Sequence, residues 1–73
     1  ERGMFIVSEE LCQNCKTLKR MLGDKIISVQ FVKASENMDL CRRLGIKAIP
    51  ALVKDDETVV FDLDDIVTEI EKD

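Results

Sequence analysis

The sequence predicts an α/β fold, with strands and helices in the order β-α-β-α-β-β-α along a single domain, residues 1–73. Short apolar runs typical of strands alternate with longer segments whose apolar residues recur at helical spacing. The first half has the spacing of a β-α-β unit, so its two strands should run parallel with a right-handed crossover. The last two strands are close enough in sequence for an antiparallel hairpin. We therefore expect a four-stranded mixed sheet with three flanking helices.

The first half of the chain accounts for two strands and one helix. Residues 4–7 are continuously apolar, which is typical of a short, buried central strand. A helix is expected over residues 11–22, with Gly23 as its C-cap. Its buried face should carry Leu11, Cys15, Leu18 and Leu22. Apolar and polar residues then alternate over 27–32, which predicts the second strand.

The second helix is expected to begin at Ser35 as its N-cap, with Glu36 in its first turn, and to end at Gly45. Its apolar face should carry Leu40, Cys41 and Leu44. This position indicates that Cys41 packs as a small buried hydrophobe.

The only proline, Pro50, stands at the start of the apolar run 51–53. Because proline donates no ladder hydrogen bond, it fits either a strand entry in trans or a bend that turns the backbone of Ile49 outward. A polar turn over 54–57 leads to a pairing strand over 58–61, and Asp62 is a plausible N-cap for the last helix. The inner stripe of that helix should be Leu63, Ile66, Val67 and Ile70.

The stretch Cys12-Gln13-Asn14-Cys15 follows the first strand and lies at the start of the first helix. A helix start offers unpaired backbone N–H groups and a partial positive charge, and both stabilise a thiolate at Cys12. Cys15 follows three residues later, close enough for a disulfide to form between the two cysteines. The pattern predicts reversible dithiol–disulfide exchange, with Cys12 as the nucleophile and Cys15 as the resolving thiol.

Zinc sites use the same cysteine spacing, so a metal is the main chemical alternative. The chain has no histidine and one further cysteine, Cys41, which leaves only a three-cysteine site completed by a carboxylate. Two cysteines that merely pack are the other alternative. The odd number of cysteines argues against a disulfide-stapled scaffold. We expect neither a metal nor another bound cofactor.

Charge and composition limit the classes of partner and the compartment that we expect. The net charge is −4, and the chain has no tryptophan or tyrosine, so nucleic-acid binding is not expected. Neither a signal peptide nor an apolar run long enough to span a bilayer is recognisable, which favours a cytoplasmic protein without membrane association. Whether residues 1–3 precede a natural start at Met4 is left open by the sequence.

The chain resembles the thioredoxin superfamily, specifically its small glutaredoxin-like members, in three features. They are the Cys12–Cys15 motif after the first strand, the stretch Gly-Ile-Lys-Ala-Ile-Pro over 45–50 before the third, and the order of elements. The resemblance implies a thioredoxin-like, glutaredoxin-type fold and a monomeric protein dithiol–disulfide oxidoreductase, an electron carrier whose only redox group is the Cys12–Cys15 disulfide. It implies protein disulfides as substrates and a thioredoxin-type reductase upstream.

In this family the proline is cis and lies against the cysteine pair, and the backbone of the preceding residue binds the substrate chain. The resemblance therefore implies a cis bond before Pro50. The substrate-binding residues that it implies are Gln13, Asn14, Ala48, Ile49 and Pro50.

The chain also departs from the family pattern. Gln13-Asn14 replaces the usual middle pair, no aromatic residue precedes Cys12, and Glu9-Glu10 stands where glutathione-binding members tend to carry a basic residue. Only the acidic pair Asp64-Asp65 looks like the glutathione-binding end. Since carboxylates beside the site would repel those of glutathione, a reductase is favoured over glutathione as the electron donor. Two further hypotheses are a redox-inactive binding module and a metal or iron–sulfur carrier that uses the cysteine pair across a dimer.

Overall fold

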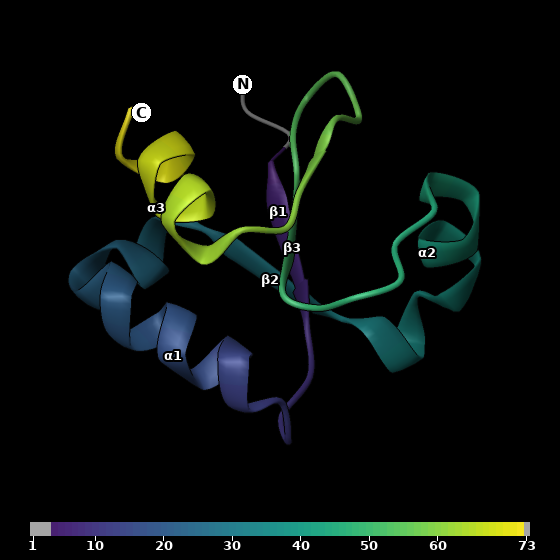
Figure 1. Ribbon diagram of the computed structural model, residues 1–73, viewed down its shortest axis with the longest axis horizontal. Helices are drawn as coiled ribbons and strands as arrows, with labels where there is room; N and C mark the ends of the chain where they lie inside the picture. The colour runs from purple at the N-terminus through teal and green to yellow at the C-terminus, as the bar shows by residue number, and fades with distance from the viewer. Residues whose placement is uncertain (1–3, 73) are drawn as a thin grey trace.

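The computed structural model describes residues 4–72 and contains a four-stranded sheet in the order β2-β1-β3-β4 (Figure 1). The strands are β1 (Phe5–Ser8), β2 (Gln30–Lys33), β3 (Ala51–Val53) and β4 (Val59–Val60). β1 runs parallel to β2 and antiparallel to β3, and β3 runs antiparallel to β4. The predicted mixed sheet and element order are confirmed. The question of a natural start at Met4 concerns residues 1–3, which lie outside the described residues.

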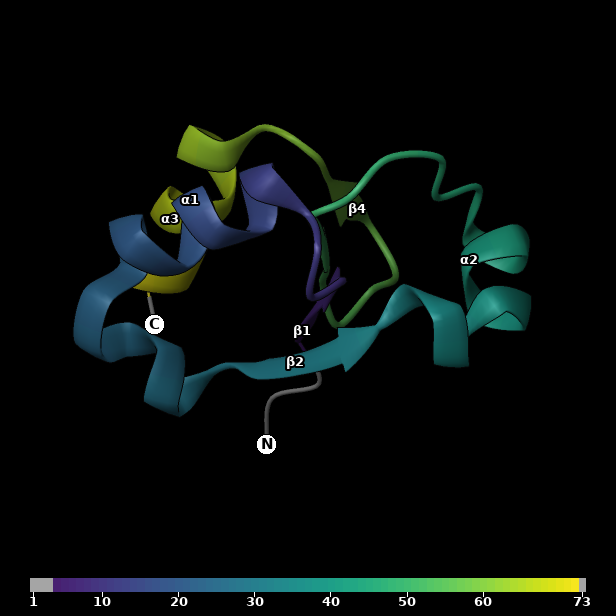
Figure 2. The ribbon, with the colours of Figure 1, turned by 90° about the horizontal axis from the view of Figure 1, so that it is seen from below.

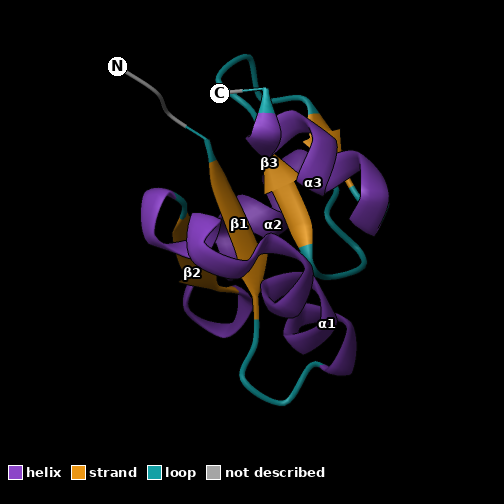
Figure 3. Cartoon of the chain, turned by 90° about the vertical axis from the view of Figure 1, so that its left-hand side faces the viewer, coloured by secondary structure: helices purple, strands orange, loops and turns teal. Residues whose placement is uncertain are grey.

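Three α-helices flank the sheet: α1 (Gln13–Leu22), α2 (Met38–Leu44) and α3 (Leu63–Glu71). α1 and α3 lie together on one side of the sheet and α2 lies on the other side (Figure 2). Figure 3 looks onto the side that α1 and α3 cover, with both helices in front of the strands. Two short 3₁₀ helices, over 23–28 and 34–36, precede β2 and α2.

One row of side chains crosses the sheet and forms the centre of the core. Ile6 in β1 is the register partner of Phe31 in β2 and of Leu52 in β3, and Leu52 is the partner of Val60 in β4. Since side chains on paired residues share a face, this row points toward α1 and α3. The same cluster includes four buried helix residues: Leu18, Leu22, Ile66 and Ile70. The predicted inner stripe of α3 is therefore confirmed.

The predicted second strand begins too early. Residues 23–28 form a 3₁₀ helix after Gly23, and β2 starts only at Gln30. Gln30 pairs with Phe5, the first residue of β1, so residues before it have no strand to pair with. Ile27, which the alternation placed in the sheet, is 87% exposed. β4 is likewise shorter than predicted and leaves Phe61 exposed, because its partner β3 has only three residues.

The predicted start of the second helix is wrong by two residues. Ser35 lies in the 3₁₀ turn 34–36, and Asn37 stands at the N-cap position of α2. The side chain of Asn37 is occupied by a hydrogen bond from Nδ2 to the carbonyl of Lys33, at 2.8 Å. Gly45 ends the helix in the left-handed conformation, as predicted.

Cys41 is half-buried and not fully buried as predicted. None of the residues of α2 is fully buried, since a helix of seven residues offers only two turns to pack against the sheet. Leu40 and Leu44, the other residues of the predicted apolar face, are also half-buried.

Asp62 is the N-cap of α3, as predicted, and its carboxylate accepts hydrogen bonds from the backbone N–H groups of Asp64 at 2.9 Å and Asp65 at 3.3 Å. We expect Asp62→Ala to lower the free energy of unfolding by about 1 kcal/mol, because two helix N–H groups lose their acceptor. Urea denaturation measures this loss. Asp62→Asn keeps an acceptor oxygen and should lose less; equal losses in both variants would contradict a capping role.

Candidate functional site

Cys12 is the N-cap of α1 and joins the end of β1 to that helix. Its Sγ accepts a hydrogen bond from the backbone N–H of Cys15 at 3.1 Å, and its carbonyl accepts one from the N–H of Lys16 at 3.2 Å. The sulfur therefore occupies the position at which a helix start stabilises negative charge. No acidic residue lies in the first turn of α1 to oppose that effect.

Leu11 does not lie on the buried face of α1, contrary to the prediction. The N–H of Cys12 donates to the carbonyl of Glu9 at 3.3 Å, which closes a turn over 9–12 before the helix begins. Leu11 lies in this turn, and 95% of its surface is exposed. The other three residues of the predicted stripe, Cys15, Leu18 and Leu22, are buried as expected.

Cys15 lies one turn into α1 and is only 2% exposed. The pKa of the Cys15 thiol is raised to about 11. Burial is the main cause, and a hydrogen bond to the side chain of Cys12 adds to it. Cys15 therefore stays protonated at neutral pH. The two cysteines are thus chemically different: one sulfur accepts a hydrogen bond at a helix start, and the other is a buried thiol.

The segment before β3 meets this pair of cysteines. The Ile49–Pro50 peptide bond is cis, as the resemblance implied, and the trans alternative is not observed. The sulfur of Cys12 lies 3.8 Å from the carbonyl oxygen of Ile49, to which its thiol donates. This carbonyl faces the sulfur and not the outside, which corrects the expectation that both backbone groups of Ile49 turn outward. Pro50 is buried and Ile49 half-buried.

The structure brings together most of the predicted site residues. Cys12, Cys15 and Ile49 are linked by the hydrogen bonds of the Cys12 sulfur, and Pro50 follows Ile49 directly. Gln13 and Asn14 are exposed on the first turn of α1, between the cysteines. Ala48 is exposed beside Ile49. No contact of Gln13 or Asn14 singles them out for binding, and Ala48 only lines the groove beside the site, so the roles of all three stay predictions.

A groove of about 630 Å³ lies beside this site, between α2 and the segment that leads to Pro50. Its apolar lining comes from α2, the turn before it and the segment 46–49: Ala34, Met38, Cys41, Ile46, Ala48 and Ile49. Its polar lining consists of Glu9, Ser35, Arg42 and Lys47. Ile49 belongs both to the groove and to the surroundings of the Cys12 sulfur. Sequence reasoning missed Met38, Cys41, Ile46 and Lys47 as neighbours of the site, because only the fold brings α2 to this segment.

The acidic residues before Cys12 are engaged away from the sulfur. The carboxylate of Glu9 accepts a hydrogen bond from the backbone N–H of Ser35, and this bond, with a second from the Ser35 side chain, holds the pKa of Glu9 below its ordinary value. Glu10 forms an ion pair with Lys33 at 3.3 Å. The Glu9 carboxylate is therefore held in its ionised form, and the partners of the two carboxylates lie within residues 33–35. Only Glu10 is paired with a cation, so Glu9 keeps its negative charge near the site, and the expected repulsion of glutathione stays a prediction.

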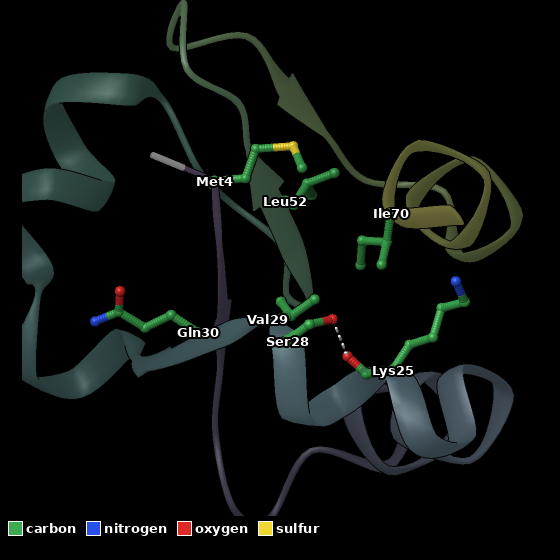
Figure 4. Close-up of a pocket in the computed structure, with 7 residues that line it drawn as sticks. All are labelled: Met4, Lys25, Ser28, Val29, Gln30, Leu52 and Ile70. Carbon is green, nitrogen blue, oxygen red and sulfur yellow. Dashed lines mark hydrogen bonds between the residues drawn. The ribbon is translucent and has the colours of Figure 1, made fainter. Parts of the chain in front are cut away.

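A second cavity, of about 470 Å³, lies elsewhere in the molecule. Figure 4 shows it between the start of β1, the 3₁₀ helix after α1 and the end of α3, with Met4, Leu52 and Ile70 around it and Lys25 at its edge. Neither cysteine of the motif lines it. We therefore assign the site by the cysteines and the groove beside them, and not by this cavity.

Within residues 4–72, no three His, Cys, Asp or Glu side chains are grouped so that they could hold a metal ion. Of the helices described, none combines the length and the apolar character needed to span a bilayer.

The raised pKa of Cys15 predicts a loss of stability in the reduced protein between pH 9.0 and about pH 11. The unfolded chain releases the proton of Cys15 near pH 9.0, whereas the folded chain holds it until about pH 11. Between these values the unfolded state binds fewer protons, so a rise in pH favours unfolding. Urea denaturation at stepped pH measures the slope. Cys15→Ala should have a smaller slope than wild type, because it lacks the thiol whose pKa burial raises; equal slopes would contradict the assignment.

Comparisons of the chain with protein-family models, with curated proteins and with solved structures found no match. The function is therefore inferred from the geometry around Cys12, Cys15 and Ile49.

Proposed function

We propose that this chain is a thiol–disulfide oxidoreductase of thioredoxin-like, glutaredoxin-type fold that reduces disulfides in other proteins. One observation carries the proposal: the sulfur of Cys12 lies between the N–H of Cys15, at 3.1 Å, and the carbonyl of Ile49, at 3.8 Å. A cysteine that only packs would not be expected to accept a hydrogen bond at a helix start and also to donate one to the backbone of a distant segment. The sheet order β2-β1-β3-β4 supports the same proposal.

The first step forms a mixed disulfide. The thiolate of Cys12 attacks one sulfur of the substrate disulfide, the Cys12–substrate bond forms, and the other substrate sulfur leaves as a thiolate. The N–H of Cys15 donates to the Cys12 sulfur at 3.1 Å and stabilises the attacking thiolate. Cys15 cannot compete for the substrate at this stage, because burial keeps it protonated, with a pKa of about 11.

The second step releases the substrate. Cys15 gives up its proton to solvent or to the departing thiolate, and the resulting thiolate attacks the sulfur of Cys12. The Cys12–Cys15 disulfide forms as the mixed disulfide breaks, so two electrons pass to the substrate, whose two sulfurs become thiols. The protein must then be reduced again by a dithiol donor, for which we propose a thioredoxin-type reductase in the cytoplasm in preference to glutathione.

The proposal is tested by insulin reduction with dithiothreitol as the electron donor. Wild type should accelerate precipitation of the insulin B chain well beyond dithiothreitol alone. Reduced Cys15→Ser, mixed with insulin after removal of dithiothreitol, should stop after one step and accumulate a mixed disulfide with insulin through Cys12, visible by mass spectrometry. A wild-type chain that is no faster than dithiothreitol alone, and a Cys15→Ser variant without the adduct, would leave the redox-inactive binding module as the better explanation.

A further inference from the structure

We propose that Ser8 is a positioning residue for the second step of the exchange. Once Cys12 is bonded to substrate, the hydroxyl group of Ser8 binds the sulfur of Cys15, relays its proton to solvent and stabilises the thiolate that remains. This inference rests on the proposed oxidoreductase function and deepens it. It names the group that lets a buried, protonated thiol become the resolving nucleophile.

Ser8 is the only polar or charged residue that is buried among residues 4–72, with 6% of its surface exposed. Its hydroxyl group forms no hydrogen bond with another residue in this range. A buried polar group without a partner costs stability, so a hydroxyl group left in an apolar core needs an explanation. No side-chain oxygen in this range is both wholly buried and without a partner, so the Ser8 oxygen must contribute to the small exposed area. The hydroxyl group is therefore available to a partner and in reach of water.

The fold places Ser8 beneath Cys15. Side chains alternate along β1, so Ser8 shares with Ile6 the face of the sheet that α1 covers (Figure 3). Ile6 packs in one cluster with Leu18 of α1. Cys15 lies one helical turn before Leu18, toward the start of α1. Ser8 lies one step beyond Ile6 on the same face, toward the end of β1 from which α1 departs. The two residues are therefore neighbours across the packed helix and strand.

The backbone that follows Ser8 supports this placement. The N–H group of Glu9 donates a hydrogen bond to the sulfur of Cys15, and this bond lowers the pKa of that thiol. Since Glu9 follows Ser8 directly, the sulfur lies within one residue of the hydroxyl group. The carboxylate of Glu9 is occupied elsewhere, by the N–H of Ser35. In the reduced protein the Cys15 thiol is bonded to the side chain of Cys12, which leaves the Ser8 hydroxyl group unused.

Bonding of Cys12 to substrate changes the surroundings of Cys15. In the reduced protein, burial, the hydrogen bond to the Cys12 side chain and the charge of Cys12 all raise the pKa of the Cys15 thiol. In the mixed disulfide the Cys12 sulfur is uncharged and only a weak acceptor, so the last two causes disappear. The Cys15 thiol then lacks an acceptor, and the oxygen of Ser8 is the unpartnered one on that face of the sheet.

The step is a proton relay followed by attack. The Cys15 thiol donates to the Ser8 oxygen; its proton moves to this oxygen while the original hydroxyl proton passes to a water molecule. The restored hydroxyl group now donates to the Cys15 thiolate. The thiolate attacks the Cys12 sulfur and forms the Cys12–Cys15 bond. The substrate sulfur leaves with the electron pair of the broken bond and takes up a proton from solvent.

No other side chain is buried with Cys15 to take its proton. The chain has no histidine, and none of the acidic or basic side chains within residues 4–72 is buried. The ammonium group of Lys19, one turn further along α1, also lowers the pKa of Cys15, but it is exposed and lies 5.1 Å from the centroid of the Phe31 ring. A protonated amine can stabilise the thiolate but cannot accept its proton. The relay is therefore assigned to Ser8.

Rapid mixing with one equivalent of Ellman's reagent separates the two steps. Every protein compared carries Cys41→Ala, so that Cys12 and Cys15 are the only thiols. Attack by Cys12 releases one equivalent of the coloured thiolate, and resolution by Cys15 releases a second. Ser8→Ala should leave the rate of the first release unchanged and slow the second about ten-fold at neutral pH, because the Cys15 thiolate loses a donor.

A matched pair of variants tests the hydroxyl group itself. Threonine and valine have similar shapes, and only threonine has a hydroxyl group. Ser8→Thr should keep the second release near the wild-type rate, whereas Ser8→Val should slow it as Ser8→Ala does. The control is Ser28→Ala, which removes an exposed hydroxyl group at the other cavity (Figure 4) and should leave both rates unchanged. Equal slowing in Ser8→Thr and Ser8→Val would assign the effect to packing and overturn the role of the hydroxyl group.

A thiol titration separates this inference from the proposed function. In a chain with Cys12→Ala and Cys41→Ala, Cys15 is the only thiol, and the ultraviolet absorbance of its thiolate gives its pKa. Adding Ser8→Ala should raise the pKa of Cys15 by about one pH unit. If the chain with an intact Cys12–Cys15 pair releases only one equivalent from Ellman's reagent, the oxidoreductase function fails, and the contact of Ser8 with Cys15 is judged by this titration alone. An unchanged pKa of Cys15 would overturn that contact.

Discussion

Replacing Cys12 with serine is expected to abolish disulfide reduction, with a fall in rate of at least about a thousandfold. The serine hydroxyl stays protonated at neutral pH and cannot replace the thiolate as the attacking group. Cys15 cannot take over the attack, because it is only 2% exposed and holds its proton until about pH 11. Insulin reduction and single-turnover reduction of hydroxyethyl disulfide both measure the loss.

Two further variants make this result specific to the roles of the cysteines. Cys15→Ser should still open one substrate disulfide and then remain bonded to the substrate through Cys12. Cys41→Ala is expected to retain turnover, because Cys41 lies on α2, outside the Cys12–Cys15 pair. Activity that survives in Cys12→Ser, with the adduct formed at Cys15, would reverse the assignment of nucleophile and resolving thiol.

The core and the order of elements could be predicted because each rests on local periodicity. The apolar run that contains Ile6 and the stripe of Ile66 and Ile70 need no knowledge of the neighbours to be recognised. The N-cap at Asp62 and the helix end at Gly45 also depend only on nearby residues. The Asp62 carboxylate accepts hydrogen bonds from the first helix N–H groups, and Gly45 readily adopts the left-handed conformation that ends a helix. The cysteine pair could be placed at a helix start for the same reason.

The groove and the limits of several elements could not be predicted, because they depend on contacts between distant segments. β2 begins at Gln30 only because β1 begins at Phe5. The groove forms only when α2 and residues 46–49 come together. Leu11 matches the helical stripe, yet the turn that positions Cys12 excludes it from the helix.

Leu18→Ala is expected to lower the free energy of unfolding by about 3 kcal/mol. Leu18 is fully buried, and it packs in the cluster that joins α1 to Ile6, Leu52 and Ile66. Removing three carbon atoms there loses their transfer free energy and leaves a cavity that the surrounding strands can only partly fill. A domain of this length is stable by roughly 4–11 kcal/mol, so the loss is a large share of the total. The midpoint of urea denaturation should fall while its slope stays constant.

Leu11→Ala is the matched control, since it makes the same chemical change at the other end of the stripe that the sequence indicated. Leu11 is 95% exposed, so its truncation creates no cavity, and the free energy of unfolding should change by less than about 0.5 kcal/mol. A large loss in Leu11→Ala would show that residue 11 packs into the core, as the helical pattern alone predicts. The turn over 9–12 would then be wrong. The placement of the Cys12 sulfur at the start of α1 would be wrong as well, because it depends on the same hydrogen bond from the N–H of Cys12 to the carbonyl of Glu9.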